Sequence, residues 1–116
     1  MTGRTKTYTV WRDHEGLVRA TVACDYTSSL DGTGRSEAYA LPHLLKHSPD
    51  GFEFGYAGSG PADLARSIVG DFLATHDPEP RIYRQVNAVF ITPLEGDGPH
   101  EIAGDEVNHI IEECCP

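Results

Sequence analysis

Apolar residues recur every three to four positions between residues 61 and 76, which is the clearest periodic pattern in the chain. This spacing places them along one side of an α-helix, while the polar positions between them fall on the other side. We therefore predict an amphipathic helix over 61–76, ended by the prolines at 78 and 80. Its apolar face is formed by Leu64, Ala65, Ile68, Val69, Phe72 and Leu73, and its solvent face by Asp63, Arg66, Ser67 and Asp71.

A second stretch with helical spacing lies near the end of the chain and predicts a helix over 104–115. A shorter helix is predicted over 42–47, because Pro42 suits a first helical position and the run Ser-Pro-Asp-Gly at 48–51 then forms a tight turn. The later helix would bury Val107, Ile110, Ile111 and Cys114 and leave Glu106, His109 and Glu113 in solvent.

Four segments have the composition of β-strands. Residues 5–12 and 17–24 are rich in threonine and valine, and the four residues 13–16 between them suit a turn, so the pair predicts an antiparallel hairpin. A third strand is predicted over 52–56, where three aromatic residues alternate with Glu53 and Gly55. Residues 82–92 are apolar on both alternating faces, which predicts a strand in the middle of a sheet.

These elements predict one α+β domain over residues 1–116, with the order ββ(α)βαβα. An antiparallel sheet of about four strands would pack against the two main helices. Residues 25–37 contain several glycine, serine and aspartate positions without periodicity, and we predict a flexible surface loop there. Pairing of exposed strand edges between two copies would give a homodimer.

The charge of the chain narrows the classes of partner. Eighteen acidic residues against nine lysines and arginines give a formal net charge of -9, which repels phosphate backbones and argues against direct nucleic-acid binding. No apolar run approaches the ~20 residues that cross a bilayer, and the first residues lack the basic and apolar regions of an export signal. Three cysteines do not form a disulfide framework. We expect a cytoplasmic protein with no membrane contact.

The segment from His47 to Ala65, HSPDGFEFGYAGSGPADLA, resembles the signature of a family of small proteins of unknown function from bacteria, phages and plasmids. That family typically reads H-S-P-x-G-F-E-W-G-Y-x-G-S-G-P-x-x-L-A, so Phe54 stands where the family has tryptophan. The resemblance implies a fold and a shared surface patch, but no reaction. It also implies an association with mobile genetic elements, whose proteins often bind and block host proteins such as CRISPR or restriction components.

The same segment is the first candidate for ligand chemistry. Backbone N–H groups at Gly58-Ser59-Gly60-Pro61, together with the positive end of the following helix, could bind an anion or another small ligand. The candidate residues are His47, Glu53, Tyr56, Gly58, Ser59 and Gly60. The alternative is structural, with Ser59 or Gly60 capping the helix and Pro61 at its first position. The run lacks the lysine of a phosphate-binding P-loop, and Asp63 would repel an anion.

Other chemistry has weaker support in the sequence. His43 and His47 could share a helical face and bind a metal, but they lack a third ligand, and the alternative has His43 facing water. Cys24, Cys114 and Cys115 do not have C-x-x-C spacing, and no G-x-S-x-G elbow marks a hydrolase. We therefore expect no cofactor and no metal, and we do not expect an enzyme.

By elimination, the sequence favours a small acidic interaction protein that acts by binding a protein partner. The family resemblance suggests a component of a host defence system, such as CRISPR, as that partner. The alternative is a ligand-binding protein or an enzyme that uses the helix start at Gly58–Pro61.

Overall fold

The computed structural model describes residues 2–28, 34–44 and 51–114. The elements in chain order are β1 (Thr2–Arg12), β2 (Val18–Ser28), β3 (Gly34–Ala40), α1 (Ser59–Leu73), α2 (Pro80–Val86), the π-helical turn η1 (Asn87–Ile91), β4 (His100–Ala103) and α3 (Gly104–Cys114). The α+β class and the four-stranded antiparallel sheet are confirmed. No helix in these described ranges has both the length and the apolar character needed to span a membrane.

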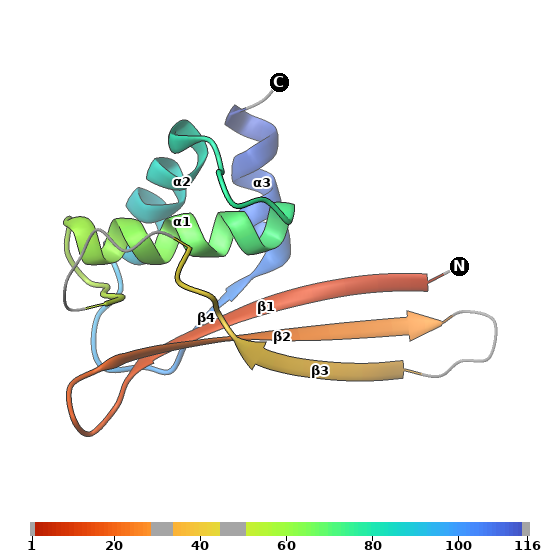
Figure 1. Ribbon diagram of the computed structural model, residues 1–116, viewed down its shortest axis with the longest axis horizontal. Coiled ribbons are helices and arrows are strands. Elements are labelled where there is room, and N and C mark those ends of the chain that lie inside the picture. Colours follow the sequence, from red (N-terminus) through yellow and green to blue (C-terminus); the bar gives the residue numbers. More distant parts are fainter. Residues whose placement is uncertain (1, 29–33, 45–50, 115–116) are drawn as a thin grey trace.

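The strands lie in the order β3-β2-β1-β4, and every neighbouring pair is antiparallel. The predicted hairpin is confirmed, and its β1 and β2 strands pair from Thr2↔Ser28 to Arg12↔Val18. All three helices lie on the same side of the sheet, so the fold has two layers (Figure 1).

The two faces of the sheet differ in composition because side chains alternate along each strand. The inner face, which meets the helices, contains the buried residues Tyr8, Val10, Val22, Cys24 and Ile102. The outer face is made of the alternate positions and is mostly threonine and alanine. Its described members are Thr5, Thr7, Thr9, Trp11, Arg19, Thr21, Ala23, Asp25, Ser36, Ala38, Ala40, Glu101 and Ala103.

The hairpin turn is held by the side chain of Asp13. Its Oδ1 accepts the N–H groups of Glu15 at 2.9 Å and Leu17 at 3.0 Å, while Oδ2 accepts from Arg19 Nε at 2.9 Å. Gly16 has a φ of +84°, which a residue without a Cβ adopts most readily. The composition of residues 13–16 therefore fixes the turn and, through it, the register of the sheet.

Asp13 is expected to titrate below the ordinary pKa of an aspartate. The N–H of Leu17 is the main cause of the lowered pKa, with Arg19 and the N–H of Glu15 adding to it. Because the pKa of Asp13 is lower in the folded state, its ionised carboxylate stabilises the folded protein. This stabilisation is fully present above the unfolded-state pKa and is lost as the pH falls through the folded-state pKa. Carboxyl-carbon NMR titration measures this directly, and an Asp13 pKa at or above the ordinary value would contradict the assignment.

Both main helices are confirmed. Helix α1 begins two residues earlier than predicted and ends at Leu73 instead of 76, because Ala74 adopts a left-handed conformation at φ 55° and closes the helix. Leu64, Ala65, Ile68 and Val69 are fully buried against the sheet and the other helices. Helix α3 buries Val107 and Ile110 as expected.

The prediction of a central strand over 82–92 is wrong, since α2 and η1 occupy this segment. Pro80 starts the helix at a position where no backbone N–H is needed. Ile82, Val86 and Ile91 are buried at spacings of four and five residues, and the wider π turn keeps Ile91 on the buried side. A short run that is apolar on both faces cannot be distinguished from a buried helix by its periodicity alone.

Three other predicted segments also differ from the structure. Residues 25–28 belong to β2 and 34–37 to β3, so the predicted loop over 25–37 is mostly strand, while 29–33 lie outside the described residues. The outer-face positions of β3 carry serine and alanine, so the strand shows no alternation of apolar and polar residues in the sequence. Residues 52–54 form no strand, because the chain turns at Gly55, where φ is +87°. In the predicted 42–47 helix, residues 42–44 are irregular and 45–47 are outside the described ranges.

Candidate functional site

The aromatic and glycine-rich segment 51–58 is an irregular corner that leads into α1. Gly55 donates its N–H to the carbonyl oxygen of Ile91 at 3.0 Å, which ties the corner to the end of η1. A Cβ at Gly55 would lie 2.9 Å from the carbonyl oxygen of Leu94. The glycine is thus required by both its conformation and its close backbone neighbour.

Gly55→Ala is expected to destabilise the fold more than Gly16→Ala does. Both glycines have positive φ values, +87° and +84°, so alanine pays about 1–2 kcal/mol at either position. Only Gly55 adds a steric clash, since nothing lies within 4 Å of a Cβ at Gly16. Thermal or urea unfolding of the two variants measures the difference, and equal losses would show that the Leu94 contact is unimportant.

Glu53, a predicted ligand residue, forms an ion pair across the fold. Its two carboxylate oxygens accept from Arg12 Nη1 at 2.7 Å and Nη2 at 3.0 Å. The hydrogen bond from Arg12 is also the main cause of that guanidinium's raised pKa. Arg12 lies over the ring of Phe54, 5.2 Å from its centroid. The pair therefore joins the hairpin to the corner, so the carboxylate of Glu53 is already engaged.

The remaining candidates surround the start of α1. Gly60 is buried, and a Cβ there would lie 2.7 Å from Glu53 Cβ. A Cβ at Gly58 would lie 2.8 Å from the ring of Tyr56. Gly58, not Ser59 or Gly60, is the N-cap residue, and its carbonyl accepts the N–H of Ala62 at 3.0 Å.

The helix start itself is open to solvent. Tyr56 is 50% exposed and Ser59 is exposed, while Pro61 is the third residue of α1 instead of the first. No side chain caps α1 by a hydrogen bond at Gly58. His47, the remaining predicted ligand residue, lies outside the described residues. The structure thus brings Glu53 and Gly60 together, and Tyr56 and Gly58 together, around a surface-exposed helix N-terminus.

The polar side of α1 contains a feature that the sequence analysis missed. Asp63, Ser67 and Asp71 are four residues apart and form one row along the helix, which we call the polar stripe. We predicted these residues in solvent, but Asp63 and Ser67 are each 1% exposed. They are buried because the segment 41–44 and the inner face of the sheet supply hydrogen-bonding partners for them. The i, i+4 spacing of these polar residues was the available signal.

The first two members of the polar stripe bind the segment that follows β3. His43 Nε2 lies 3.0 Å from Asp63 Oδ2, and the imidazole stacks on Phe52 with centroids 4.3 Å apart. Ser67 Oγ accepts the N–H of Leu44 at 3.2 Å. The expectation that His43 faces water is therefore wrong, since its side chain is 22% exposed. Asp63 orients the ring from a buried position.

Asp71, the third member, joins α1 to two strands. Its Oδ2 accepts from Lys6 Nζ at 3.0 Å and from the Tyr8 hydroxyl at 2.8 Å, while Oδ1 accepts from the Tyr39 hydroxyl at 2.7 Å. Burial, with the hydrogen bond to Asp71, raises the pKa of Tyr8 far above its ordinary value. Tyr8 thus remains a proton donor at every physiological pH.

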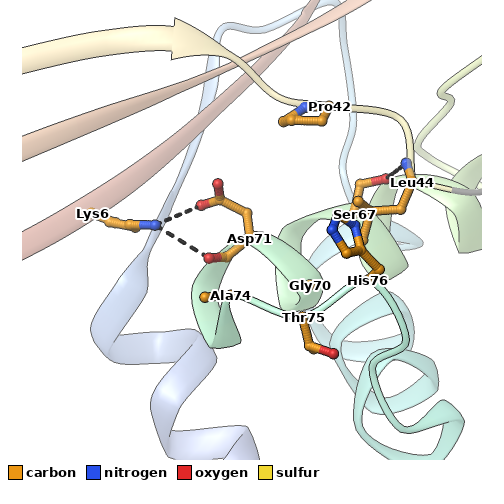
Figure 2. A pocket seen from close by; sticks show the side chains of 9 residues that line it. All are labelled: Lys6, Pro42, Leu44, Ser67, Gly70, Asp71, Ala74, Thr75 and His76. Atoms are coloured by element: carbon orange, nitrogen blue, oxygen red, sulfur yellow. Dashed lines mark hydrogen bonds and ion pairs between the residues drawn. The ribbon is translucent and has the colours of Figure 1, made fainter.

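A cleft of about 380 Å³ opens beside this cluster, and Lys6 and Asp71 meet at its wall (Figure 2). It lies between the C-terminal half of α1 and the segment that follows β3. Its lining residues are Lys6, Pro42, Leu44, Ser67, Gly70, Asp71, Ala74, Thr75 and His76. The cleft is within the size range of small-molecule sites in proteins.

In the described ranges no group of three or more His, Cys, Asp or Glu side chains gathers at metal-binding distance. Cys24 is buried on the inner face and Cys114 is half-buried on α3, while Cys115 lies outside the described ranges. The arrangement therefore offers hydrogen-bonding and apolar surfaces for binding.

Comparison with known proteins gives one match. The family model described as "Family of unknown function (DUF6166)" matches residues 11–113, which covers most of the chain. Neither the curated proteins nor the solved structures give a match.

Proposed function

This chain belongs to DUF6166, a family of unknown function, and we propose that it binds a protein partner by adding one of the partner's strands to the edge of its sheet. The observation that carries the proposal is the edge strand β3, whose residues with described side chains are all exposed, beside the sheet face opposite the helices.

The outer face presents mostly small side chains to a partner. All three helices lie on the opposite side of the sheet (Figure 1). Among the described outer-face residues only Arg19, Asp25 and Glu101 are charged, although the whole chain has a formal net charge of -9. Because threonine and alanine side chains are short, a partner bound at the β3 edge could also pack against this face. Trp11 adds an aromatic contact at one end.

Strand β3 is at one edge of the sheet and has seven residues, against four in β4 at the other edge. Leu41 donates its N–H to Ala20, so in the antiparallel register Tyr39 and Glu37 also point their backbone groups toward β2. The backbone groups of Ser36, Ala38 and Ala40 therefore point outward. The strand contains neither lysine nor proline, two residues that commonly protect such edges.

The charge of the chain favours a basic partner. Asp25 and Glu37 are exposed on β2 and β3, close to the edge where the added strand would lie. Over the whole chain acidic residues outnumber lysines and arginines by 18 to 9. An extended segment rich in lysine or arginine would be attracted to this protein, and the attraction would weaken as salt is added.

The resemblance of residues 47–65 to proteins of phages and plasmids supports a narrower proposal. In it, the partner is a protein of a host defence system, such as a CRISPR component, and binding inhibits that component. This part is tested by plasmid or phage challenge of cells that express the protein. Unchanged interference by the defence system would contradict it.

The binding proposal is tested by capture from cells of the source organism. A tagged wild-type chain is cross-linked, recovered and compared with Ala38→Pro and Ala38→Ser. Proline removes an outward N–H without removing a bond to β2, whereas serine keeps that N–H. We expect a basic protein to be recovered with the wild type and with Ala38→Ser, and to be lost with Ala38→Pro.

Ser59→Ala supplies the second control, because Ser59 is exposed at the start of α1, away from β3. It is expected to keep the partner. Recovery of the same protein by Ala38→Pro would contradict strand addition, and its loss in Ser59→Ala would instead favour the helix N-terminus as the binding site.

A further inference from the structure

The cleft beside α1 contains a lysine that donates two hydrogen bonds. Lys6 Nζ donates to the backbone oxygen of Asp71 at 3.2 Å and to its Oδ2 at 3.0 Å. An ammonium group has three N–H donors, so one donor has no acceptor among the described residues and can serve a ligand. The Lys6 side chain is 9% exposed, and it lines the cleft with Asp71 (Figure 2).

The carboxylate of Asp71 can likewise accept a further hydrogen bond. Its Oδ2 accepts from both Lys6 and Tyr8, whereas Oδ1 accepts the Tyr39 hydroxyl alone among the described residues. A carboxylate oxygen can accept two hydrogen bonds, so Oδ1 can accept one more. One wall of the cleft thus offers a donor and an acceptor on neighbouring residues. The two charges are opposite and sum to zero.

We propose that this cleft binds a small neutral ligand that has an amide-type edge, with one hydrogen-bond acceptor beside one donor. The ligand's carbonyl oxygen accepts from Lys6, and its N–H donates to Asp71 Oδ1. Pro42, Leu44 and Ala74 give the cleft apolar surface for the rest of the ligand. Amides, lactams and pyrimidine rings belong to this chemical class.

The charges of Lys6 and Asp71 are the reason to expect an uncharged ligand. An anion attracted by Lys6 would meet the carboxylate of Asp71, and a cation attracted by Asp71 would meet the ammonium of Lys6. A neutral ligand uses both groups without separating the ion pair. Because burial strengthens hydrogen bonds to charged groups, these two contacts would determine selectivity.

The test uses three small probes of similar size, followed by two-dimensional amide NMR of the full chain. The lactam 2-piperidone is expected to shift the amide signals of Gly70, Asp71 and Thr75 in a saturable manner. Acetate and methylammonium at equal concentration are expected to leave these signals in place. Saturable shifts from either ion with none from the lactam would overturn the proposal, as would the absence of lactam shifts.

Two variants locate the site. Lys6→Met keeps the length of the side chain and removes the donor, so lactam affinity is expected to fall at least about tenfold. His76→Trp places a larger side chain in the lining of the cleft without altering the ion pair and is expected to abolish the shifts. His14→Trp, in the exposed hairpin turn, is the matched control and should bind normally. Unchanged binding by His76→Trp would overturn the proposal even if Lys6→Met does not fold.

Discussion

Replacing Asp71 with alanine is expected to lower the free energy of unfolding by about 3–5 kcal/mol, because it breaks a buried ion pair from one side. Lys6 and Asp71 have side chains that are 9% and 11% exposed, with 3.0 Å between Nζ and Oδ2. The substitution leaves the ammonium without its counterion. It also removes the acceptor that the hydroxyls of Tyr8 and Tyr39 share.

Urea denaturation with linear extrapolation measures this loss. Asp77→Ala is the matched control, because Asp77 also forms an ion pair, with Arg66 at 3.3 Å, but its own side chain is 93% exposed. That control is expected to change stability by no more than about 0.5 kcal/mol. If Asp71→Ala costs no more than Asp77→Ala, the cluster does not hold α1 on the sheet.

The second large effect concerns Ile91, and it separates the helical structure of residues 82–91 from the strand that the sequence predicts. In a strand, Val89 and Ile91 would share a face and similar burial. In the structure Ile91 is fully buried and Val89 is 42% exposed. Ile91→Ala is expected to cost about 2–5 kcal/mol, and Val89→Ala less than about 1 kcal/mol.

Thermal and urea unfolding of both variants measure these losses. Similar losses at the two positions would support an alternating strand and contradict the π turn that places Ile91 inside. The reverse order, with Val89→Ala the more damaging, would contradict the observed packing altogether.

The long elements could be predicted because each has enough residues to repeat its pattern. Helix α1 has four turns of apolar spacing, and α3 has three, so a strand pattern could not imitate them. The hairpin was predictable for another reason. Asp13 and Gly16 form a turn of distinctive composition between two runs of threonine and valine.

The short elements could not be predicted from local pattern. Strand β4 has four residues, of which only Ile102 is buried. Strand β3 is an edge strand whose outward positions carry alanine and serine, so neither face shows an apolar repeat. Residues 82–91 bury Ile82, Val86 and Ile91 through tertiary packing, and a short run that is apolar on both faces is compatible with either a strand or a buried helix.

The candidate site was only partly predictable for a similar reason. The partners of the polar stripe are distant in sequence: Asp71 lies 65 residues from Lys6, and Asp63 lies 20 residues from His43. The sequence shows the i, i+4 spacing of the polar stripe, but it does not show which segments would pack over these residues and bond to them. Glu53 was identified as a ligand candidate, and the structure pairs it with Arg12, which is 41 residues away in sequence.

Hydrogen exchange of the β3 amides, with and without the captured partner, tests strand addition most directly. In the free protein the N–H groups of Ser36, Ala38 and Ala40 point outward and should exchange quickly, while those of Glu37 and Tyr39 are bonded to β2 and should exchange slowly. Binding is predicted to slow exchange at Ser36, Ala38 and Ala40. Unchanged exchange at all three in the bound state, with new protection at the start of α1, would contradict the account.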